Sequence, residues 1–407
     1  MRRIRSSLTV DARAWAASLL WLAVGLAAAA EPRVVPHGRL ETLNGYTVVS
    51  VEGTPEQMGT AYGTLLKPLI QRVVQDVVAD DVLGDPGRRA EILRASRLMA
   101  RFQPKAYLAE LRAMAKAAEV PYDQLVLLQF FGDVQRAMPV RGGAQFCTSF
   151  AMVPPLTRGR RCLVGRNFDY FYSGVAEYAS ILACYRPKGR IAFVTVTWAG
   201  VINGWTLLSE RGIVASNNTA YGIHDSLEGI STCFLLRHVV EQAKTVDEGV
   251  ALVRKGPRAC GTALLIASGD PPDAALVEFD HRRIAVRRPR DGFVGADNSF
   301  LRLYRGTEQE PSEWSRIAKA RALALAARGK LDFSTNLAGA PGVPLRGINL
   351  HSTVLDATAL RLKVAMGDTP ACEQPYRAFR LTRKGLVADP QANDTPEPGE
   401  ARDEELE

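Results

Sequence analysis

The sequence has few of the residues that carry the commonest enzyme chemistries. Only five histidines occur in 407 residues, and they form no HExxH pattern. The six cysteines show no CxxC spacing, which argues against a zinc site. The glycine-rich loops that bind nucleotides and the GxSxG pattern of serine hydrolases are also missing. The sequence therefore gives no support to metal, dinucleotide or serine-hydrolase chemistry, and we expect no metal and no cofactor.

Aromatic residues are also scarce, at 7%, although 47% hydrophobic and 23% charged residues are ordinary globular values. The net charge of +8 is an average, because residues 1–30 carry +3, residues 387–407 carry −7 and residues 31–386 therefore carry +12. Basic and aromatic residues do not cluster as they do in nucleic-acid-binding proteins, so we expect no nucleic-acid partner. The positive charge of residues 31–386 is compatible with a solvated basic surface, an acidic acyl substrate or an anionic cell surface.

Only one long apolar run occurs, from Ala14 to Ala30, and it follows a basic segment. This order of charged, apolar and small residues is typical of a secretory signal peptide. The run has 17 residues, whereas a membrane-spanning helix needs about 20. We therefore expect residues 1–30 to be a signal peptide, the protein to be exported to the periplasm or secreted, and no stable membrane insertion after its removal. A retained anchor is the alternative.

The rest of the chain changes character at residue 147. Residues 31–146 are expected to form a helical piece, in which a β-type run at residues 48–53 precedes helical spacing over residues 54–138. This spacing begins at a capping-box pattern of Thr54 and Gln57. Short β-type runs separated by glycine turns follow residue 147, with helical spacing again at 232–255 and 312–328. Strands and helices in blocks predict a layered α+β fold. The acidic, proline-rich residues 387–407 predict a disordered tail.

One cysteine stands in an informative context. Cys147 begins a β-type run just after a small-residue break, and the following run carries Arg166 and Asp169 three residues apart. Antiparallel pairing of these two runs would bring both charged residues beside Cys147. An arginine near a thiol stabilises the thiolate, and a carboxylate can hold an amine in place. The sequence therefore predicts a cysteine nucleophile with a cation and a carboxylate in reach.

The ordered motifs resemble the N-terminal-nucleophile (Ntn) hydrolases of linear amides. This group includes the C45 peptidases or isopenicillin-N acyltransferase-like enzymes, acid ceramidase, N-acylethanolamine acid amidase, and the bile-salt and penicillin V hydrolases. The matching segments are residues 53–59, 147–149, 165–169, 278, 295–300, 351–356 and 367–376. The resemblance covers roughly residues 48–377. It implies a four-layer αββα sandwich of antiparallel sheets, in which residues 31–146 and 147–386 fold as one domain.

The resemblance also implies a mechanism. In such enzymes the bond before the nucleophile breaks autocatalytically, which here places the cleavage between Phe146 and Cys147. The freed α-amine then becomes the general base, and its pKa of about 7.7–8.0 suits that task near neutral pH. The implied activity is hydrolysis of a linear C–N amide bond in a small N-acyl substrate through a Cys147 acyl-enzyme. An acyltransferase on the same scaffold and a non-catalytic secreted binding protein are the alternatives.

Further residues receive roles from the same resemblance. Asp169 orients the α-amine, Arg166 supports the thiolate, and Asn298 supplies an oxyanion donor. Arg316 is the nearest match to an arginine that follows the catalytic asparagine in part of the group.

A second oxyanion donor is harder to place. Where many relatives have an asparagine before a turn, this chain has Ser-Glu-Arg-Gly at residues 209–212. Asn217 or Asn218, one strand later, is the expected substitute. His224 and His351 remain alternative partners for the thiol. The sequence leaves open the acyl group, the amine, the state of the other five cysteines and the oligomeric state.

Overall fold

The computed structural model describes residues 31–138, 146–172 and 174–393. The expected signal peptide, residues 1–30, therefore lies outside the described residues, and so does most of the expected tail, residues 394–407.

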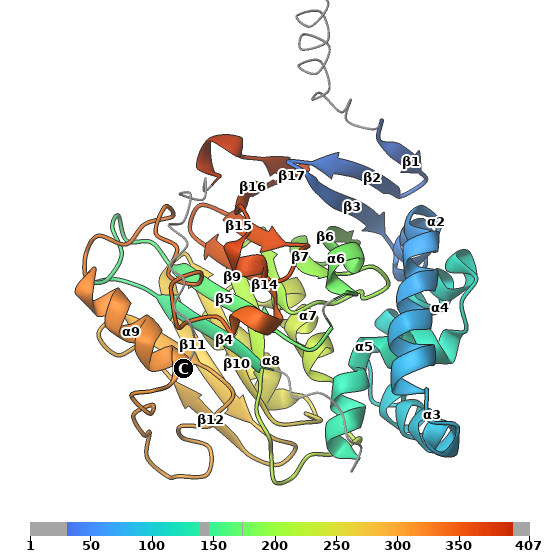
Figure 1. The fold of residues 1–407 in the computed structure, drawn as a ribbon, viewed down its shortest axis with the longest axis horizontal. Coiled ribbons are helices and arrows are strands. Elements are labelled where there is room, and N and C mark those ends of the chain that lie inside the picture. Colours follow the sequence, from blue (N-terminus) through green and yellow to red (C-terminus); the bar gives the residue numbers. More distant parts are fainter. Residues whose placement is uncertain (1–30, 139–145, 173, 394–407) are drawn as a thin grey trace, which may run out of the picture.

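Two β-sheets stacked face to face form the centre of the molecule (Figure 1). In spatial order, the first sheet contains β1 (Arg33–Val35), β2 (Gly38–Leu43), β3 (Tyr46–Gly53), β6 (Ser180–Pro187), β7 (Phe193–Trp198), β8 (Thr206–Ser209), β9 (Ile213–Thr219), β10 (Thr262–Gly269), β11 (Pro272–Phe279) and β12 (Ile284–Arg287). The second contains β13 (Phe293–Ala296), β4 (Phe146–Met152), β5 (Leu163–Asp169), β14 (Asn349–Asp356), β15 (Arg361–Met366), β16 (Arg377–Thr382) and β17 (Gly385–Ala388). The pairings are antiparallel, with the parallel pair β3–β6 as the exception among the described strands.

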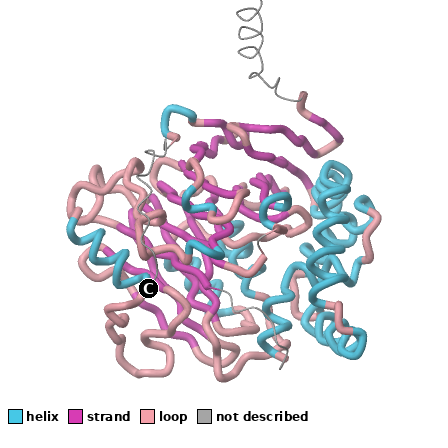
Figure 2. The backbone as a smooth tube through the Cα atoms, viewed as in Figure 1, coloured by secondary structure: helices cyan, strands magenta, loops and turns pink. Residues whose placement is uncertain are grey.

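Helices cover both outer faces of this sandwich (Figure 2). They are α2 (Pro55–Val73), which continues as the π-helical η1 (Val74–Val82), α3 (Pro86–Ala100), α4 (Lys105–Ala118), α5 (Tyr122–Ala137), α6 (Ala176–Ala179), α7 (Thr232–Gln242), α8 (Val246–Lys255) and α9 (Arg316–Ala326). Apolar side chains of α2, α4, α5, α7 and α8 pack with the outer face of the first sheet, and those of α9 with the second. The four-layer αββα architecture is therefore confirmed.

The segment before Cys147 is less purely helical than expected. The helices begin as predicted at Thr54, whose side chain and that of Gln57 form the capping box. The strand expected at residues 48–53 is part of β3. However, β1 and β2, which were not expected, precede it, and all three strands join the first sheet. Most residues of β1 and β2 are exposed or half-buried, so they show no apolar period that sequence inspection could detect. Because β3 pairs with β6, the segments before and after Cys147 share one sheet.

The fold also extends further toward the C-terminus than expected. Residues 387–393, assigned from composition to a disordered tail, contain the end of β17 and a short 3-10 helix, η4 (Pro390–Ala392). The carboxylate of Asp389 lies 2.7 Å from the guanidinium of Arg361, and the Asn393 side chain accepts a hydrogen bond of 2.7 Å from the Ala378 amide. Specific partners therefore hold a segment whose acidic composition alone suggested disorder.

No helix in the described part of the chain is both long and apolar enough to cross a membrane. The two inner sheet faces meet in an apolar layer that includes Val164 of β5, Val194 of β7 and Leu265 of β10. This rigid layer fixes β4 and β5 with respect to β9, and these three strands carry most of the residues that the sequence singled out.

Candidate active site

Cys147 lies near the start of β4, where the antiparallel partner β5 returns beside it. In the ladder Cys147 faces Phe168, and Ser149 faces Arg166. Side chains alternate between the faces of a strand, so Cys147 and Arg166 share one face on diagonal positions. Nη2 of Arg166 donates a hydrogen bond of 3.2 Å to the Sγ atom of Cys147. The structure thus brings together the cysteine and arginine that strand pairing predicted.

The Arg166 guanidinium is fully buried, with 0% of its surface exposed. It also donates to the carbonyl of Asn167 and lies over the Phe168 ring. Within the described residues no carboxylate forms an ion pair with it, and its Nε atom has no hydrogen-bond partner. A buried cation without a counter-ion is costly. A thiolate on Cys147 would supply the missing negative charge.

A second set of contacts surrounds the backbone nitrogen of Cys147. This N–H donates to Oδ1 of Asn298 at 2.9 Å. The same oxygen accepts a bond of 2.8 Å from Nη2 of Arg316, whose Nη1 donates to Oδ2 of Asp169 at 2.8 Å. Arg316, which the sequence singled out only by its place after Asn298, therefore joins the asparagine to the carboxylate. Asn298 thus holds the nitrogen that cleavage would free, and Arg316 links Asn298 to Asp169.

Asp169 is fully buried at the end of β5. Besides Arg316, its carboxylate accepts hydrogen bonds from Nδ2 of Asn349 at 2.7 Å and from the Leu345 amide at 3.3 Å. Burial raises the pKa of Asp169 to about 6, although the bonds from Asn349 and Arg316 oppose this shift. The group is therefore a carboxylate at neutral pH and becomes protonated in mild acid.

The side-chain N–H group of Asn298 already has a hydrogen-bond acceptor, unlike that of a free oxyanion donor. Its Nδ2 donates to the carbonyl of Thr219 at 2.7 Å, while its oxygen faces the Cys147 nitrogen. The following loop is anchored by Glu278, whose carboxylate accepts the backbone N–H groups of residues 301–303 at 2.8–3.0 Å. In the uncut chain Asn298 thus positions the nucleophile's own nitrogen. Its role as an oxyanion donor stays a prediction.

The two candidates for the second oxyanion donor occupy neighbouring positions on β9 and so face opposite ways. Nδ2 of Asn218 donates to Ser149 Oγ at 2.6 Å and to the Ala296 carbonyl at 3.2 Å, so this side chain faces β4. Asn217 therefore faces the helical layer. Of the two, Asn218 is the one on the side of the nucleophile, where it contacts the residue two positions after Cys147.

The two histidines proposed as thiol partners have other partners. His351 is buried, bonds through Nε2 to Oγ1 of Thr206 at 3.0 Å and stacks on Phe168. Burial, together with the nearby Arg166, lowers the pKa of His351 well below its ordinary value, so the ring stays neutral. His224 pairs with the carboxylate of Asp280 at 2.8 Å. Both rings are therefore committed to other groups.

The remaining cysteines are buried or half-buried thiols without a disulfide partner among the described residues. All six cysteines lie in the described part of the chain, and none forms a disulfide there. Burial raises the pKa of the other five thiols, which are Cys162, Cys184, Cys233, Cys260 and Cys372. These five are neutral thiols at physiological pH. Cys184 is a core residue with an exposure of 6%, whereas Cys233 is only half-buried.

Aromatic side chains form a wall beside the nucleophile. Phe168, which faces Cys147 in the ladder, stacks on Trp205 with ring centroids 4.4 Å apart and meets Trp198 edge-on at 6.3 Å. These three rings are at most 5% exposed, whereas Phe171 is 57% exposed. The segment 168–172 thus contributes buried rings and one exposed ring.

One residue of the site was missed by the sequence analysis. Asn349, at the start of β14, contacts the Asp169 carboxylate directly. The available signal was its position two residues before the motif that begins at His351.

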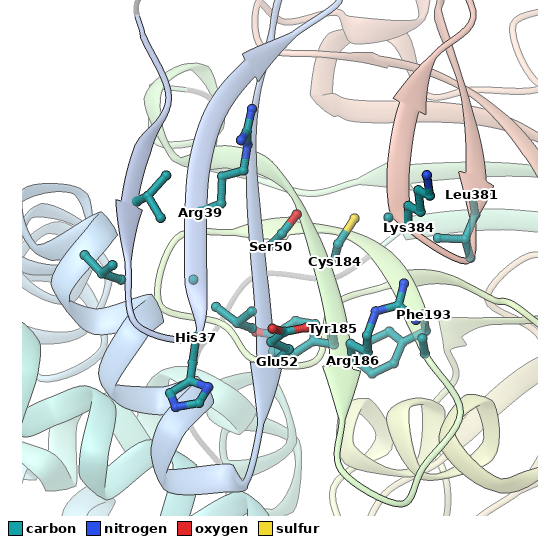
Figure 3. Close-up of a pocket in the computed structure, with 16 residues that line it drawn as sticks. His37, Arg39, Ser50, Glu52, Cys184, Tyr185, Arg186, Phe193, Leu381 and Lys384 are labelled. Carbon is teal, nitrogen blue, oxygen red and sulfur yellow. The ribbon is translucent and has the colours of Figure 1, made fainter.

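Figure 3 shows a separate pocket of about 290 Å³ between β1, β2, β3, β6 and the β16–β17 hairpin. Its lining includes Arg39, Glu52, Cys184, Arg186 and Lys384, and none of the site residues described above. The pocket is therefore not the candidate site. Across the described residues, no group of three or more His, Cys, Asp or Glu side chains could hold a metal ion.

Three comparisons place the chain among known proteins. It is 23% identical over 272 residues to the protein dcd1A of Dictyostelium discoideum, covering 60% of each chain. It is 22% identical over 307 residues to the N-acylethanolamine-hydrolyzing acid amidase of Oryctolagus cuniculus, covering 72% of this chain and 80% of that protein. The chain thus spans less than two thirds of the Dictyostelium protein.

A solved structure of the Caenorhabditis elegans N-acylethanolamine-hydrolyzing acid amidase ortholog is similar over 52% of this chain and 93% of that chain. Its sequence identity is 16% and its TM-score 0.40. Residues 156–326 match the family model described as acyl-coenzyme A:6-aminopenicillanic acid acyl-transferase. This match begins after Cys147 and contains Arg166, Asp169, Asn298 and Arg316. The match of residues 156–326 to this family model agrees with the resemblance to N-terminal-nucleophile hydrolases and acyltransferases that the order of the motifs predicted.

Proposed function

We propose that the protein is an exported cysteine Ntn hydrolase that cleaves the linear C–N amide bond of an N-acyl substrate. The reaction proceeds through an acyl-enzyme on Cys147, after autocatalytic cleavage of the Phe146–Cys147 bond. One observation carries this proposal: Cys147 is held at both reactive atoms, its Sγ by Arg166 at 3.2 Å and its nitrogen by Asn298 at 2.9 Å. A merely structural cysteine needs neither contact.

The first step is self-cleavage. The Cys147 thiolate adds to the carbonyl carbon of Phe146, and the Cys147 nitrogen leaves with a proton, which gives a thioester. Water then hydrolyses the thioester, releasing the Phe146 carboxylate and the free thiol. The bond from the Cys147 N–H to Asn298 fixes the orientation of the peptide that breaks.

The mature enzyme then uses its own α-amine. The amine takes the proton of the thiol, the thiolate attacks the amide carbonyl, and the amine returns a proton to the leaving amine. Water attacks the acyl-enzyme by the same route. Asn298 holds the amine in place, since it already accepts the Cys147 N–H in the uncut chain, and Arg316 links Asn298 to Asp169, which orients the amine.

The aromatic wall supports an apolar acyl group. Phe168 faces Cys147 and is backed by Trp205 and Trp198, so an acyl chain bound at Sγ would meet apolar surface. An acyltransferase is the second candidate, and the description of the matching family model favours it. Both activities share the acyl-enzyme and differ in whether water or an amine accepts the acyl group.

Mass spectrometry of the purified mature protein tests the proposal. We expect a fragment of 261 residues that begins at Cys147, and release of free acid from a panel of N-acyl amides with graded chain length. Addition of an amine acceptor separates the two activities, because a transferase forms the new amide in preference to the acid. An intact chain with no turnover of the panel would instead indicate a binding protein.

Export is part of the same proposal and has its own readout. We expect the mature N-terminus of the first fragment to lie near Glu31 and the protein to be found outside the cytoplasm. N-terminal sequencing and cell fractionation measure both, and a chain that keeps Met1 in the cytoplasmic fraction contradicts export without affecting the chemistry.

Arg166 provides a prediction within this mechanism. Arg166→Gln is expected to lower kcat/KM by about 10- to 100-fold, since one hydrogen bond from a cation to the thiolate is lost. Steady-state kinetics measure the loss. Arg158→Gln is the control, because Arg158 is 68% exposed and pairs with Asp332 on the surface. Equal kinetics for the two variants would contradict a role of Arg166 at the thiolate.

A further inference from the structure

Asn349 is the first residue of β14 and is fully buried. In the ladder it lies opposite Asp169 of β5. Its Nδ2 atom donates a hydrogen bond of 2.7 Å to Oδ1 of Asp169, whereas Arg316 and the Leu345 amide donate to Oδ2. Asn349 therefore donates to one carboxylate oxygen of Asp169, and the other oxygen stays available to the Arg316 guanidinium.

A bulge in β14 places this side chain. Phe168 pairs with His351 and Asp169 pairs with Asn349, so Leu350 is an extra residue between two regular pairs. Bulges of this kind often re-aim side chains next to functional sites. Here the side chain of Leu350 enters the apolar core that also contains Cys147, while Asn349 turns toward the Asp169 carboxylate.

The side-chain oxygen of Asn349 also has a hydrogen-bond partner. Oδ1 of Asn349 accepts a hydrogen bond of 2.7 Å from the Cys372 backbone N–H, in the 3-10 helix η3 (Ala371–Glu373). A backbone N–H can only donate, so the oxygen must face it and the NH₂ group must face Asp169. The amide is therefore locked as a donor to the carboxylate.

We propose that Asn349 is a positioning residue, which holds the Asp169 carboxylate ionised and aligned for the α-amine of Cys147. This inference rests on the proposed function. The Asn349 side chain bonds to the Asp169 carboxylate, the His351 carbonyl and the Cys372 N–H, so it acts on Cys147 through Asp169.

The charges around Asp169 set the size of the effect. Arg316 and the more distant Arg166 favour the carboxylate, and the Cys372 thiol is a further titratable group close to it. Burial is the largest influence and already raises the pKa of Asp169 to about 6, against the bond from Asn349. Removing that bond shifts the pKa further upward, toward the pH at which the enzyme must work.

The test compares the pH dependence of kcat/KM in three proteins. The acid limb for Asn349→Ala is expected to lie about one pH unit above that of the wild type. Asn349→Asp is expected to move the limb further, because a second carboxyl beside Asp169 opposes its ionisation. In both variants activity should recover as the pH rises, which a simple loss of folded protein would not produce.

Asn167→Ala is the matched control. Asn167 is equally buried in β5, two residues from Asp169, and makes two hydrogen bonds, to Ala338 and Ser352. We expect this variant to lose stability but to keep the acid limb of the wild type. An unshifted limb in Asn349→Ala, or the same shift in Asn167→Ala, would overturn the inference. A wild-type protein without self-cleavage and turnover would instead overturn the proposed function.

Discussion

The Cys147→Ala variant is expected to remain one uncut chain and to release no acid from any N-acyl amide. In the proposed mechanism, self-cleavage and turnover both begin with attack by the same Sγ atom, so one substitution removes both. The buried site gives no other side chain in contact with Arg166 that could act as the nucleophile, among the described residues. Denaturing electrophoresis and intact-mass measurement report the cleavage, and acid release reports turnover.

Cys233→Ala is the control for this experiment. Cys233 lies at the start of α7 and packs against the same apolar cluster that contains Cys147. Because burial raises the pKa of its thiol, it remains protonated and should contribute little as a nucleophile. We expect the control to cleave itself and to turn over substrate. A Cys147→Ala protein that is still cleaved between residues 146 and 147 would refute the assignment.

The contact between Cys147 and Arg166 could be predicted from sequence because it depends on one short hairpin. Only 18 residues separate the two positions in the chain, and the antiparallel pairing of β4 and β5 determines their distance. The helices from Thr54 onward were likewise predictable, since they carry a capping box and an apolar face of helical period.

Asn349 illustrates why other parts of the site could not be predicted. With a regular register along β14, Asn349 would not lie opposite Asp169. The register shift at Leu350 brings the two residues together, and a single sequence gives no signal for such a bulge. Strands β1 and β17 were not predicted for a related reason. Pairing with β2 and β16, and not their own composition, makes these segments strands. Arg316 lies 147 residues from Asp169 in the chain, so only the folded sheets and α9 bring them together.

A buried ion cluster joins the segments on either side of the proposed cleavage site. Arg237 of α7 donates to both carboxylate oxygens of Glu110 in α4, at 3.1 and 2.7 Å, and to Glu241 at 2.8 Å. The side chains of Arg237 and Glu110 are each 1% exposed. After cleavage α4 belongs to the first fragment and α7 to the second. The cluster then connects two separate chains.

Arg237→Met is expected to lower the free energy of unfolding by about 3–5 kcal/mol, because it leaves two carboxylates buried without their cation. Urea unfolding measures the change. Arg97→Met is the matched control, since Arg97 pairs with Asp123 at 2.9 Å but is 60% exposed. An exposed pair contributes at most about 1 kcal/mol. Similar losses for the two variants would show that the buried cluster is not a major source of stability.

The same cluster should make stability depend on pH in an unusual direction. Burial raises the pKa of Glu110 from 4.5 to about 7, against the opposing effect of Arg237. Between these values the folded state holds a proton that the unfolded state has released, so the free energy of unfolding falls as the pH rises from 4.5 to 7. Asp169, with its pKa raised to about 6, adds to the same slope. Glu110→Gln removes the larger contribution while keeping the shape of the side chain. We therefore expect urea unfolding at pH 5 and pH 7 to differ less in this variant than in the wild type, whereas an unchanged difference would exclude Glu110 as its source.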